Sequence, residues 1–144
     1  MYILSMVAVM SLFEWKENFS VKISRFDEAH KKLIELMNEI YAIIKMRKDN
    51  ATIVSVVEEL SEYSKTHFND EVEQMIKFQY PYLKEHKEEH NQFIKELDNM
   101  KEMIQRQSNL LNVQLLNFIK DWLINHIMKS DMKYGQFFLD RGLK

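Results

Sequence analysis

Hydrophobic residues recur every three or four positions along most of the chain, and this spacing predicts four amphipathic helices. Polar residues fill the positions between them, so each segment has one apolar stripe that can be buried. The four segments are defined by these apolar positions: Leu33, Ile34, Met37, Tyr41 and Ile44; Ile53, Val56, Val57, Leu60, Tyr63, Met75 and Phe78; Phe93, Ile94, Leu97, Met100 and Ile104; Leu115, Phe118, Ile119, Trp122 and Leu123.

The ends of the first two helices carry recognisable signals. Ser24 followed three residues later by Asp27 matches a capping box, so we expect the first helix to begin there and to run to about Arg47. Asn50 is expected to cap the second helix. That helix should end before the single proline, Pro81, because the residue before a proline is disfavoured in helical conformation. The turn is therefore expected at residues 80–82.

The remaining segments are connections and ends. Residues 12–23 alternate briefly between apolar and polar positions and are expected to form an extended arm that leads into the first helix. Ser108 and Asn109 mark the expected break and cap before the fourth helix. Gly135 and Gly142 lie in a short C-terminal tail that has room for one or two more helical turns. Residues 1–12 form an apolar N-terminal extension.

Four helices of similar length joined by short turns predict an all-α protein, an antiparallel up-down-up-down four-helix bundle with an extended N-terminal arm. The chain of 144 residues fits a single domain, 1–144, with the bundle at about 24–132. Only two glycines and one proline are present, which argues against sandwiches and barrels that need many tight turns.

Composition and charge exclude several classes of function. Cysteine is absent, which excludes disulfides, thiolate zinc sites, iron–sulfur clusters and covalent haem attachment. The formal net charge of −2 gives no reason to expect a nucleic-acid partner. No apolar run reaches the length of a membrane span, so no stable membrane insertion is expected. We expect a monomeric, cytoplasmic protein.

All five histidines fall on the apolar stripes of their helices: His30, His67, His86, His90 and His126. A single histidine on such a stripe is usually a core residue with its hydrogen bonds satisfied. Five out of five, with no histidine left for the surface, indicates that their side chains have a shared purpose. Imidazole is a common metal ligand in proteins.

Spacing adds two carboxylates to these histidines. His67 and Glu71 are four residues apart and so project from one face of a helix. His126 and Asp131 are five apart, an offset that turns Asp131 by roughly 140° on an ideal α-helix. If both bind one metal, the helix needs a π-type bulge, a frayed last turn or a long reach. Without the other six residues, Asp131 would be interpreted as a solvated acid at a helix end.

In an up-down-up-down bundle the five histidines and Glu71 come to one level. Measured along each helix at ~1.5 Å per residue, they lie within roughly 6–18 Å of the same end of the bundle. Five imidazoles and two carboxylates are too many ligands for one ion. Two octahedral ions offer twelve positions, of which five nitrogens, two bridging carboxylates and one bridging oxide or hydroxide fill eleven. An imidazole-plus-carboxylate set of this kind suits iron, and one position stays open for a small ligand.

At this point the sequence resembles the hemerythrin family, in particular its single-domain bacteriohemerythrin members. The similarity rests on a histidine near the start of the first helix and on three motifs: HFxxE at 67–71, HxxxH at 86–90 and HxxxxD at 126–131. The Trp15 region, Tyr80–Pro81 and Trp122–Leu123 match as well. The resemblance covers roughly residues 13–140, and the apolar extension before Phe13 departs from the family pattern.

The resemblance implies reversible O2 binding at a non-haem, oxo- or hydroxo-bridged di-iron centre. It assigns all seven ligand positions: His86, His90 and His126 to one iron, His30 and His67 to the iron with the open position, and Glu71 and Asp131 as bridges. A dry pocket is needed beside the open position, because water promotes loss of the bound O2 as superoxide or peroxide. We expect its walls to be large apolar residues, and Tyr134 to donate a hydrogen bond near the site. The expected wall residues are Leu33, Phe68, Trp122, Leu123 and Ile127.

Several functions are compatible with such a site. The favoured one is a non-enzymatic O2-binding protein for oxygen storage or delivery to oxygen-requiring enzymes. A sensor or scavenger of O2, nitric oxide or iron is the main alternative, although a sensor needs a signalling partner. A di-iron oxidase or peroxidase is disfavoured because ferritin-like di-iron sites use Glu-x-x-His pairs, and this sequence contains none. A helical interaction module without metal is the remaining alternative.

Overall fold

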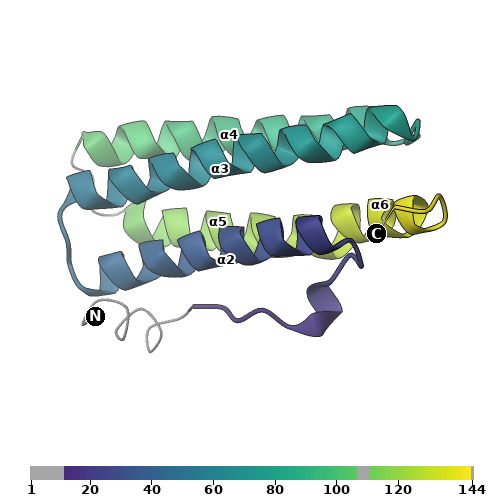
Figure 1. The fold of residues 1–144 in the computed structure, drawn as a ribbon. Helices are drawn as coiled ribbons and strands as arrows, with labels where there is room; N and C mark the ends of the chain where they lie inside the picture. The colour runs from purple at the N-terminus through teal and green to yellow at the C-terminus, as the bar shows by residue number, and fades with distance from the viewer. Residues whose placement is uncertain (1–11, 107–110, 144) are drawn as a thin grey trace.

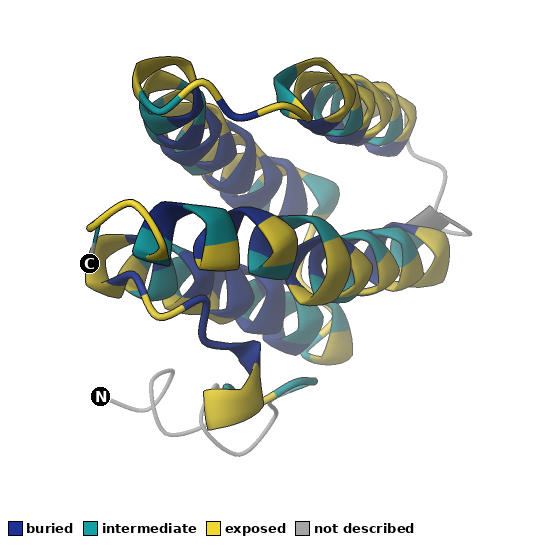
Figure 2. Cartoon of the chain, turned by 90° about the vertical axis from the view of Figure 1, so that its right-hand side faces the viewer, coloured by how far each residue is buried: buried dark blue, intermediate teal, exposed yellow. Residues whose placement is uncertain are grey.

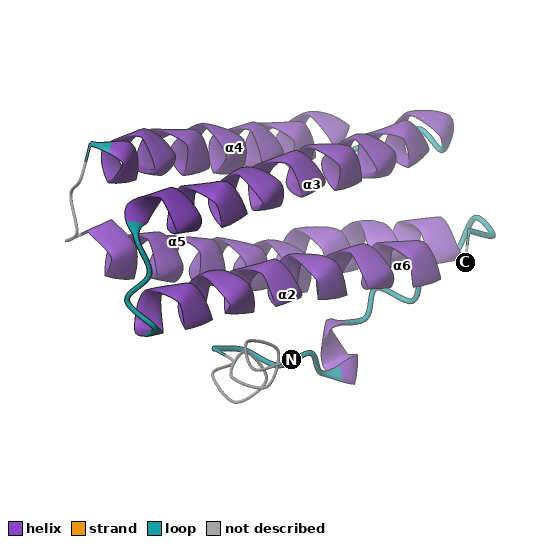
Figure 3. Cartoon of the chain, turned by 60° about the vertical axis from the view of Figure 1, so that its left-hand side comes forward, coloured by secondary structure: helices purple, strands orange, loops and turns teal. Residues whose placement is uncertain are grey.

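The computed structural model describes residues 12–106 and 111–143, and all regular structure in these two ranges is helical (Figure 3). The longest helices coincide with the four segments predicted from the hydrophobic pattern. The elements in chain order are η1 (Glu17–Phe19), α2 (Ser24–Lys45), α3 (Asn50–Lys77), α4 (Leu83–Gln105), α5 (Leu111–Asn125), η2 (His126–Asp131) and α6 (Met132–Leu139).

Helices α2, α3, α4 and the continuous α5–η2–α6 unit form an antiparallel four-helix bundle (Figure 1). Both α2 and α4 pack against α3 and against α5, so the four helices occupy the corners of a square. The predicted fold class is confirmed. The start of α2, the end of α3, the start of α4 and the η2–α6 region lie at the same end of the bundle (Figure 1).

The buried faces of the helices are turned toward the interior of the bundle (Figure 2). Ile53, Leu60, Phe93, Leu97 and Ile119 are each no more than 1% exposed and belong to one continuous apolar cluster. Burial of a large aliphatic or aromatic side chain contributes about 1.5–3 kcal/mol to folding. The core that keeps the helices in register therefore runs from the far end of the bundle up to the level of the histidines.

The helix caps differ from the sequence-based expectation. Ser24 is the first residue of α2 and its side chain makes no cap. Asp27 instead accepts hydrogen bonds from the Val21 backbone N–H at 2.8 Å and from the Ser20 hydroxyl at 2.5 Å. The cap of α3 is Asp49, which accepts from the backbone N–H of Thr52 at 2.9 Å.

Asn50 is therefore not a cap, because Asp49 already satisfies the free N–H groups of the first turn of α3. Its amide donates to the Ile104 carbonyl at 3.1 Å and so binds the C-terminal end of α4. Helix α2 ends at Lys45, two residues before the predicted end, and Arg47 adopts a left-handed backbone conformation (φ 56°). The predicted turn at 80–82 lies within the segment that joins α3 to α4. The predicted break at Ser108 and Asn109 lies outside the described residues.

The N-terminal arm precedes α2 in the chain and lies beside that helix in space. It is partly extended, with the short turn η1 in its middle. The buried Asn38 side chain binds it: the amide oxygen accepts from the backbone N–H groups of Leu12 and Phe13, and the amide N–H donates to the Phe13 carbonyl at 2.7 Å. The apolar extension lies almost entirely outside the described residues. Among the helices that are described, none has the length and apolar character needed to cross a membrane.

The tail after the fourth predicted helix contains α6, which supplies the further turns that were expected there. Gly135 lies on the buried side of this helix against the arm. A β-carbon at this position would come within 2.7 Å of the Val21 carbonyl oxygen, so only glycine allows α6 to approach the arm this closely. This contact holds the C-terminal helix over the end of the bundle where the histidines lie.

Candidate metal centre

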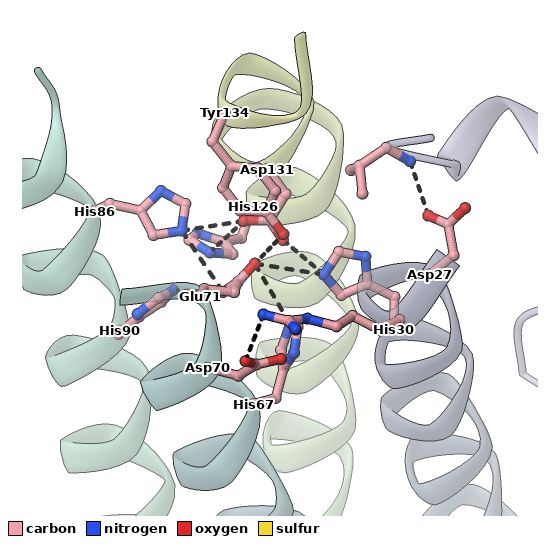
Figure 4. A network of polar contacts seen from close by, with 12 residues as sticks. Asp27, His30, His67, Asp70, Glu71, His86, His90, His126, Asp131 and Tyr134 are labelled. Atoms are coloured by element: carbon pink, nitrogen blue, oxygen red, sulfur yellow. Dashed lines mark hydrogen bonds and ion pairs between the residues drawn. The ribbon is translucent and has the colours of Figure 1, made fainter. Parts of the chain in front are cut away.

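Seven ionisable side chains from four helical segments converge in the interior at one end of the bundle (Figure 4). They are His30 on α2, His67 and Glu71 on α3, His86 and His90 on α4, and His126 and Asp131 on η2. Each is at most 5% exposed. The structure thus brings together all seven residues that the sequence analysis selected. Burial of so many charged or polar groups is costly unless they are compensated by partners or by an ion.

A π-helical segment joins the two members from the fourth helix. Residues 126–131 form π-helix between two α-helices, and His126 Nε2 lies 3.0 Å from Asp131 Oδ1. In a π-turn the hydrogen bonds connect residues five apart, which brings residues with this spacing onto one face. Of the three conformations considered for this pair, the structure adopts the π-type bulge.

Asp131 lies between two groups of histidines. Its Oδ1 atom is 3.1 Å from His86 Nε2 and 3.0 Å from His126 Nε2, whereas its Oδ2 atom is 3.0 Å from His30 Nε2. One carboxylate therefore contacts histidines from three helices, one oxygen on each side.

Glu71 has the same arrangement on the other wall of the site. Its Oε1 atom lies 3.2 Å from His90 Nε2 and 3.8 Å from His86 Nε2. Its Oε2 atom lies 3.4 Å from His67 Nε2 and 3.8 Å from His30 Nε2. Two ligand groups result, one of His86, His90 and His126 and one of His30 and His67, and both carboxylates reach from one group to the other.

The orientation of the imidazoles fits a metal site better than a hydrogen-bonded network. All five Nε2 atoms are buried and lack a hydrogen-bond partner within the described part of the chain, although each is 3.0–3.4 Å from a carboxylate oxygen. Two ligands at right angles on an ion about 2.1 Å away lie about 3.0 Å apart, which is close to these separations. The nitrogen atoms therefore point toward shared centres between the side chains, and the cluster could hold metal ions in two adjacent groups.

The pKa values show how strongly the buried carboxylates require positive charge. Burial by itself lowers the pKa of His30 and His86, but the close negative charges of Asp131 and Glu71 outweigh it and raise both values to about 9. The pKa of His126 is raised to about 9 by the same balance, mainly through Asp131. Burial by itself would raise the pKa values of Glu71 and Asp131. The surrounding histidines outweigh this effect and hold both values well below the ordinary range.

His90 differs from the other histidines. Burial dominates and lowers its pKa to about 4, with only partial compensation from Glu71. Phe68 stacks on this ring with a centroid distance of 3.8 Å and an interplanar angle of 3°. A neutral imidazole is the form that binds a metal ion, so this environment favours the ligand state of His90.

Tyr134 and Glu89 contact the cluster from outside. The fully buried Tyr134 hydroxyl donates a hydrogen bond to Glu71 Oε2, as the sequence analysis anticipated for this tyrosine. Glu89 lies on α4, and its Oε2 atom is 3.1 Å from His126 Nδ1. No spacing along a single helix identifies Glu89, because its contact with His126 joins two helices.

Each of the five predicted pocket residues lies within four positions of a clustered histidine along the chain. Leu33, Leu123 and Ile127 are each 1% exposed, and Phe68 is nearly buried. Trp122 is partly buried and stacks on His126 with a centroid distance of 4.3 Å. The role of the five residues in excluding water stays a prediction.

Comparisons with known proteins point to one family. The profile described as "Hemerythrin HHE cation binding domain" matches residues 21–138. The bacteriohemerythrin of Clostridium acetobutylicum is 32% identical over 128 residues, which cover 85% of this chain and 98% of that protein. The hemerythrin-like protein of Naegleria gruberi is 32% identical and covers 88% of this chain and 93% of its own length.

A solved structure and a further sequence relative point to the same family. A crystal structure of wild-type hemerythrin superimposes on this chain with a TM-score of 0.78 at 25% identity, covering 87% of this chain and 96% of that one. The myohemerythrin of Theromyzon tessulatum is 29% identical over 122 residues, 85% of this chain and 90% of that protein.

Proposed function

The chain belongs to the hemerythrin family, and from this premise we propose that it is a non-haem di-iron protein that binds O2 reversibly, for oxygen storage or delivery. The observation that carries the proposal is the unequal division of the histidines around two shared carboxylates. Three histidines would hold one ion and two would hold the other, with both carboxylates shared, so the second ion would have fewer protein ligands and could bind a small ligand.

The donor set supports iron. Calcium and magnesium prefer all-oxygen ligands, whereas imidazole together with carboxylate suits iron and related transition metals. When bound, two ferrous ions supply the electrons and the vacant position that O2 binding needs. His86, His90 and His126 would hold one ion, His30 and His67 the other, and Glu71 and Asp131 both.

Other side chains would protect the site and fix its geometry. Leu33, Phe68 and Leu123 form a continuous apolar cluster next to the histidines, which limits access of water to the open position. Tyr134 keeps its proton because burial raises its pKa well above the ordinary value, and so it remains a donor to Glu71. This hydrogen bond fixes the orientation of one bridging carboxylate.

The histidine-rich ligand set supports a carrier, because ferritin-like di-iron enzymes use Glu-x-x-His pairs and this sequence contains none. The five-histidine set leaves one open position, and we propose that the protein releases O2 without chemical change and serves oxygen-requiring enzymes as a donor. An oxidase would consume O2 and leave the site oxidised.

An optical spectrum recorded through an oxygen cycle tests this function. Protein loaded anaerobically with Fe(II) should develop a charge-transfer band in air and lose it under argon, over repeated cycles. The His67→Ala variant removes one of the two histidines of the open group and should lose the reversible band, whereas the exposed Met103→Ala variant should behave as the wild type. A band that persists under argon and accumulates with each cycle would contradict reversible binding.

A further inference from the structure

One carboxylate outside the cluster contacts a histidine inside it. Glu89 Oε2 lies 3.1 Å from His126 Nδ1, on the edge of the ring that faces away from the other ligands. The opposite edge presents Nε2 to Asp131 Oδ1 at 3.0 Å. The ring of His126 therefore has a carboxylate at each of its two nitrogen atoms.

This arrangement distinguishes His126 from the other four histidines. Within the described residues, their ion-pair contacts with carboxylates are all made through Nε2. The Nδ1 atoms of His30, His67 and His126 are all buried and make no hydrogen bond in the same part of the chain, but of the three only that of His126 has a carboxylate oxygen within 4 Å. The outer carboxylate is thus a feature of the three-histidine group alone, on the side away from the proposed open position.

Glu89 is held in place although its side chain is 46% exposed. It lies in a shallow groove between α4 and the α5–η2 segment, together with Trp122 and Ser130. Its Oε2 atom contacts His126 Nδ1 from within this groove. Trp122 stacks on the His126 ring with an interplanar angle of 15°, so the ring is fixed by its face as well as by its edges.

We propose that Glu89 is a positioning residue for His126, accepting the Nδ1–H of the metal-bound imidazole. A hydrogen bond at Nδ1 fixes the tautomer that leaves Nε2 free for the metal, and a carboxylate acceptor makes the imidazole a stronger donor. A stronger donor favours Fe(III) over Fe(II), so Glu89 lowers the reduction potential of the iron in the three-histidine group. The inference rests on the proposed function, because it takes that iron as the ion bound.

Two substitutions separate the charge of Glu89 from its hydrogen bond. Glu89→Gln keeps an oxygen acceptor for Nδ1–H but removes the negative charge, and Glu89→Leu removes both. Glu88→Gln is the matched control, since Glu88 is an exposed neighbour on the same helix and the substitution changes net charge equally. Because both positions are at least partly exposed, the variants are expected to fold.

The measurements are the midpoint potential of the iron-loaded protein, the exchangeable Nδ1–H resonances in its proton NMR spectrum, and iron retention against a chelator. Glu89→Gln should raise the potential and leave the His126 resonance slow to exchange. A tenfold loss of preference for Fe(III) corresponds to a rise of about 59 mV for one electron. Glu89→Leu should also make that proton exchange faster and weaken iron binding roughly 10- to 100-fold, and Glu88→Gln should match the wild type.

The outcomes separate this inference from the proposed function. If both Glu89 variants match Glu88→Gln in potential, resonances and retention, the role of Glu89 is refuted while reversible O2 binding stands. If the wild type holds two irons and fails the oxygen cycle, the function is refuted while shifts in the Glu89 variants still support the positioning role. A wild type that takes up no iron overturns both.

Discussion

His126 and Asp131 are five residues apart in the sequence, yet Nε2 of the histidine lies 3.0 Å from Oδ1 of the aspartate. The π-helical segment 126–131 makes this contact, because its wider turn accommodates one residue more than an α-turn. The two side chains belong to one face for that reason, and the helix returns to α-helix directly afterwards as α6.

The π segment should tolerate a shortening that the α-helix before it does not. Deleting the exposed Met128 leaves the two ligands four residues apart, which on an α-helix again places them on one face, so two irons per chain should be retained. Deleting the exposed Asp121 in α5 rotates the following residues by about 100° relative to those before and should abolish iron binding. Iron analysis of both purified variants checks this. Loss of iron on deletion of Met128 would show that the π geometry itself is required.

Tyr134→Phe should preserve the fold and weaken the site. The substitution keeps the buried ring and removes the donor to Glu71 Oε2, and a hydrogen bond to a charged group contributes about 1.5–3 kcal/mol. Urea denaturation of the metal-free protein should show a loss of this size in the free energy of unfolding. Tyr82→Phe, at a position that is 46% exposed, is the control and should change little. Equal stability of the two variants would mean that the Tyr134 hydrogen bond is not stabilising.

Leu123→Ala should shorten the life of the oxygenated protein more than it weakens iron binding. Leu123 is buried three residues before His126, and its truncation opens space for water beside the cluster. Leu115→Ala creates a comparable cavity in the same helix, eleven residues before His126, and should destabilise the fold without faster autoxidation. The rate at which the optical band decays in air distinguishes the two. An unchanged lifetime for Leu123→Ala would remove Leu123 from the pocket.

The metal-free protein should lose stability as the pH rises from about 6.5 to about 9. His30, His86 and His126 have folded-state pKa values raised to about 9, so over this range the folded protein binds more protons than the unfolded chain. The free energy of unfolding then falls with pH. One pKa unit corresponds to about 1.4 kcal/mol, so the loss should be several kcal/mol.

Three further ligands, His90, Glu71 and Asp131, act outside that range. The pKa of His90, lowered to about 4, gives stability that is lost below pH 6.5, and the depressed carboxylates lose theirs in stronger acid. Iron-loaded protein should lack the fall between pH 6.5 and 9, because the metal replaces the protons. Urea denaturation across the pH series, with and without iron, measures the difference. A flat profile for the metal-free protein would contradict the proposed pairing of imidazolium and carboxylate groups.

The helices and the seven clustered side chains could be predicted because the signals for both lie in the spacing of residues within each helix. Apolar residues at three- and four-residue intervals predict the buried face, and histidines on that face are placed in the interior with it. The five-residue interval between His126 and Asp131 limited the local geometry to three alternatives, but the choice of a π-turn depends on the packing of the whole helix.

The caps and the outer contacts could not be predicted in the same way. Asp49 and Asn50 are both good capping residues, and only the path of the preceding turn decides between them. Asp27 is satisfied by the arm, through Ser20 and Val21, instead of by its own helix. Glu89 contacts His126 across two helices, a relationship that the sequence of either helix alone does not contain.

The central claim is that the seven side chains hold two iron ions, and the number of irons per chain tests it most directly. Protein reconstituted anaerobically with Fe(II), freed of unbound metal and analysed by elemental analysis against protein concentration should contain two irons per chain. Zero or one iron per chain after full reconstitution would contradict the claim.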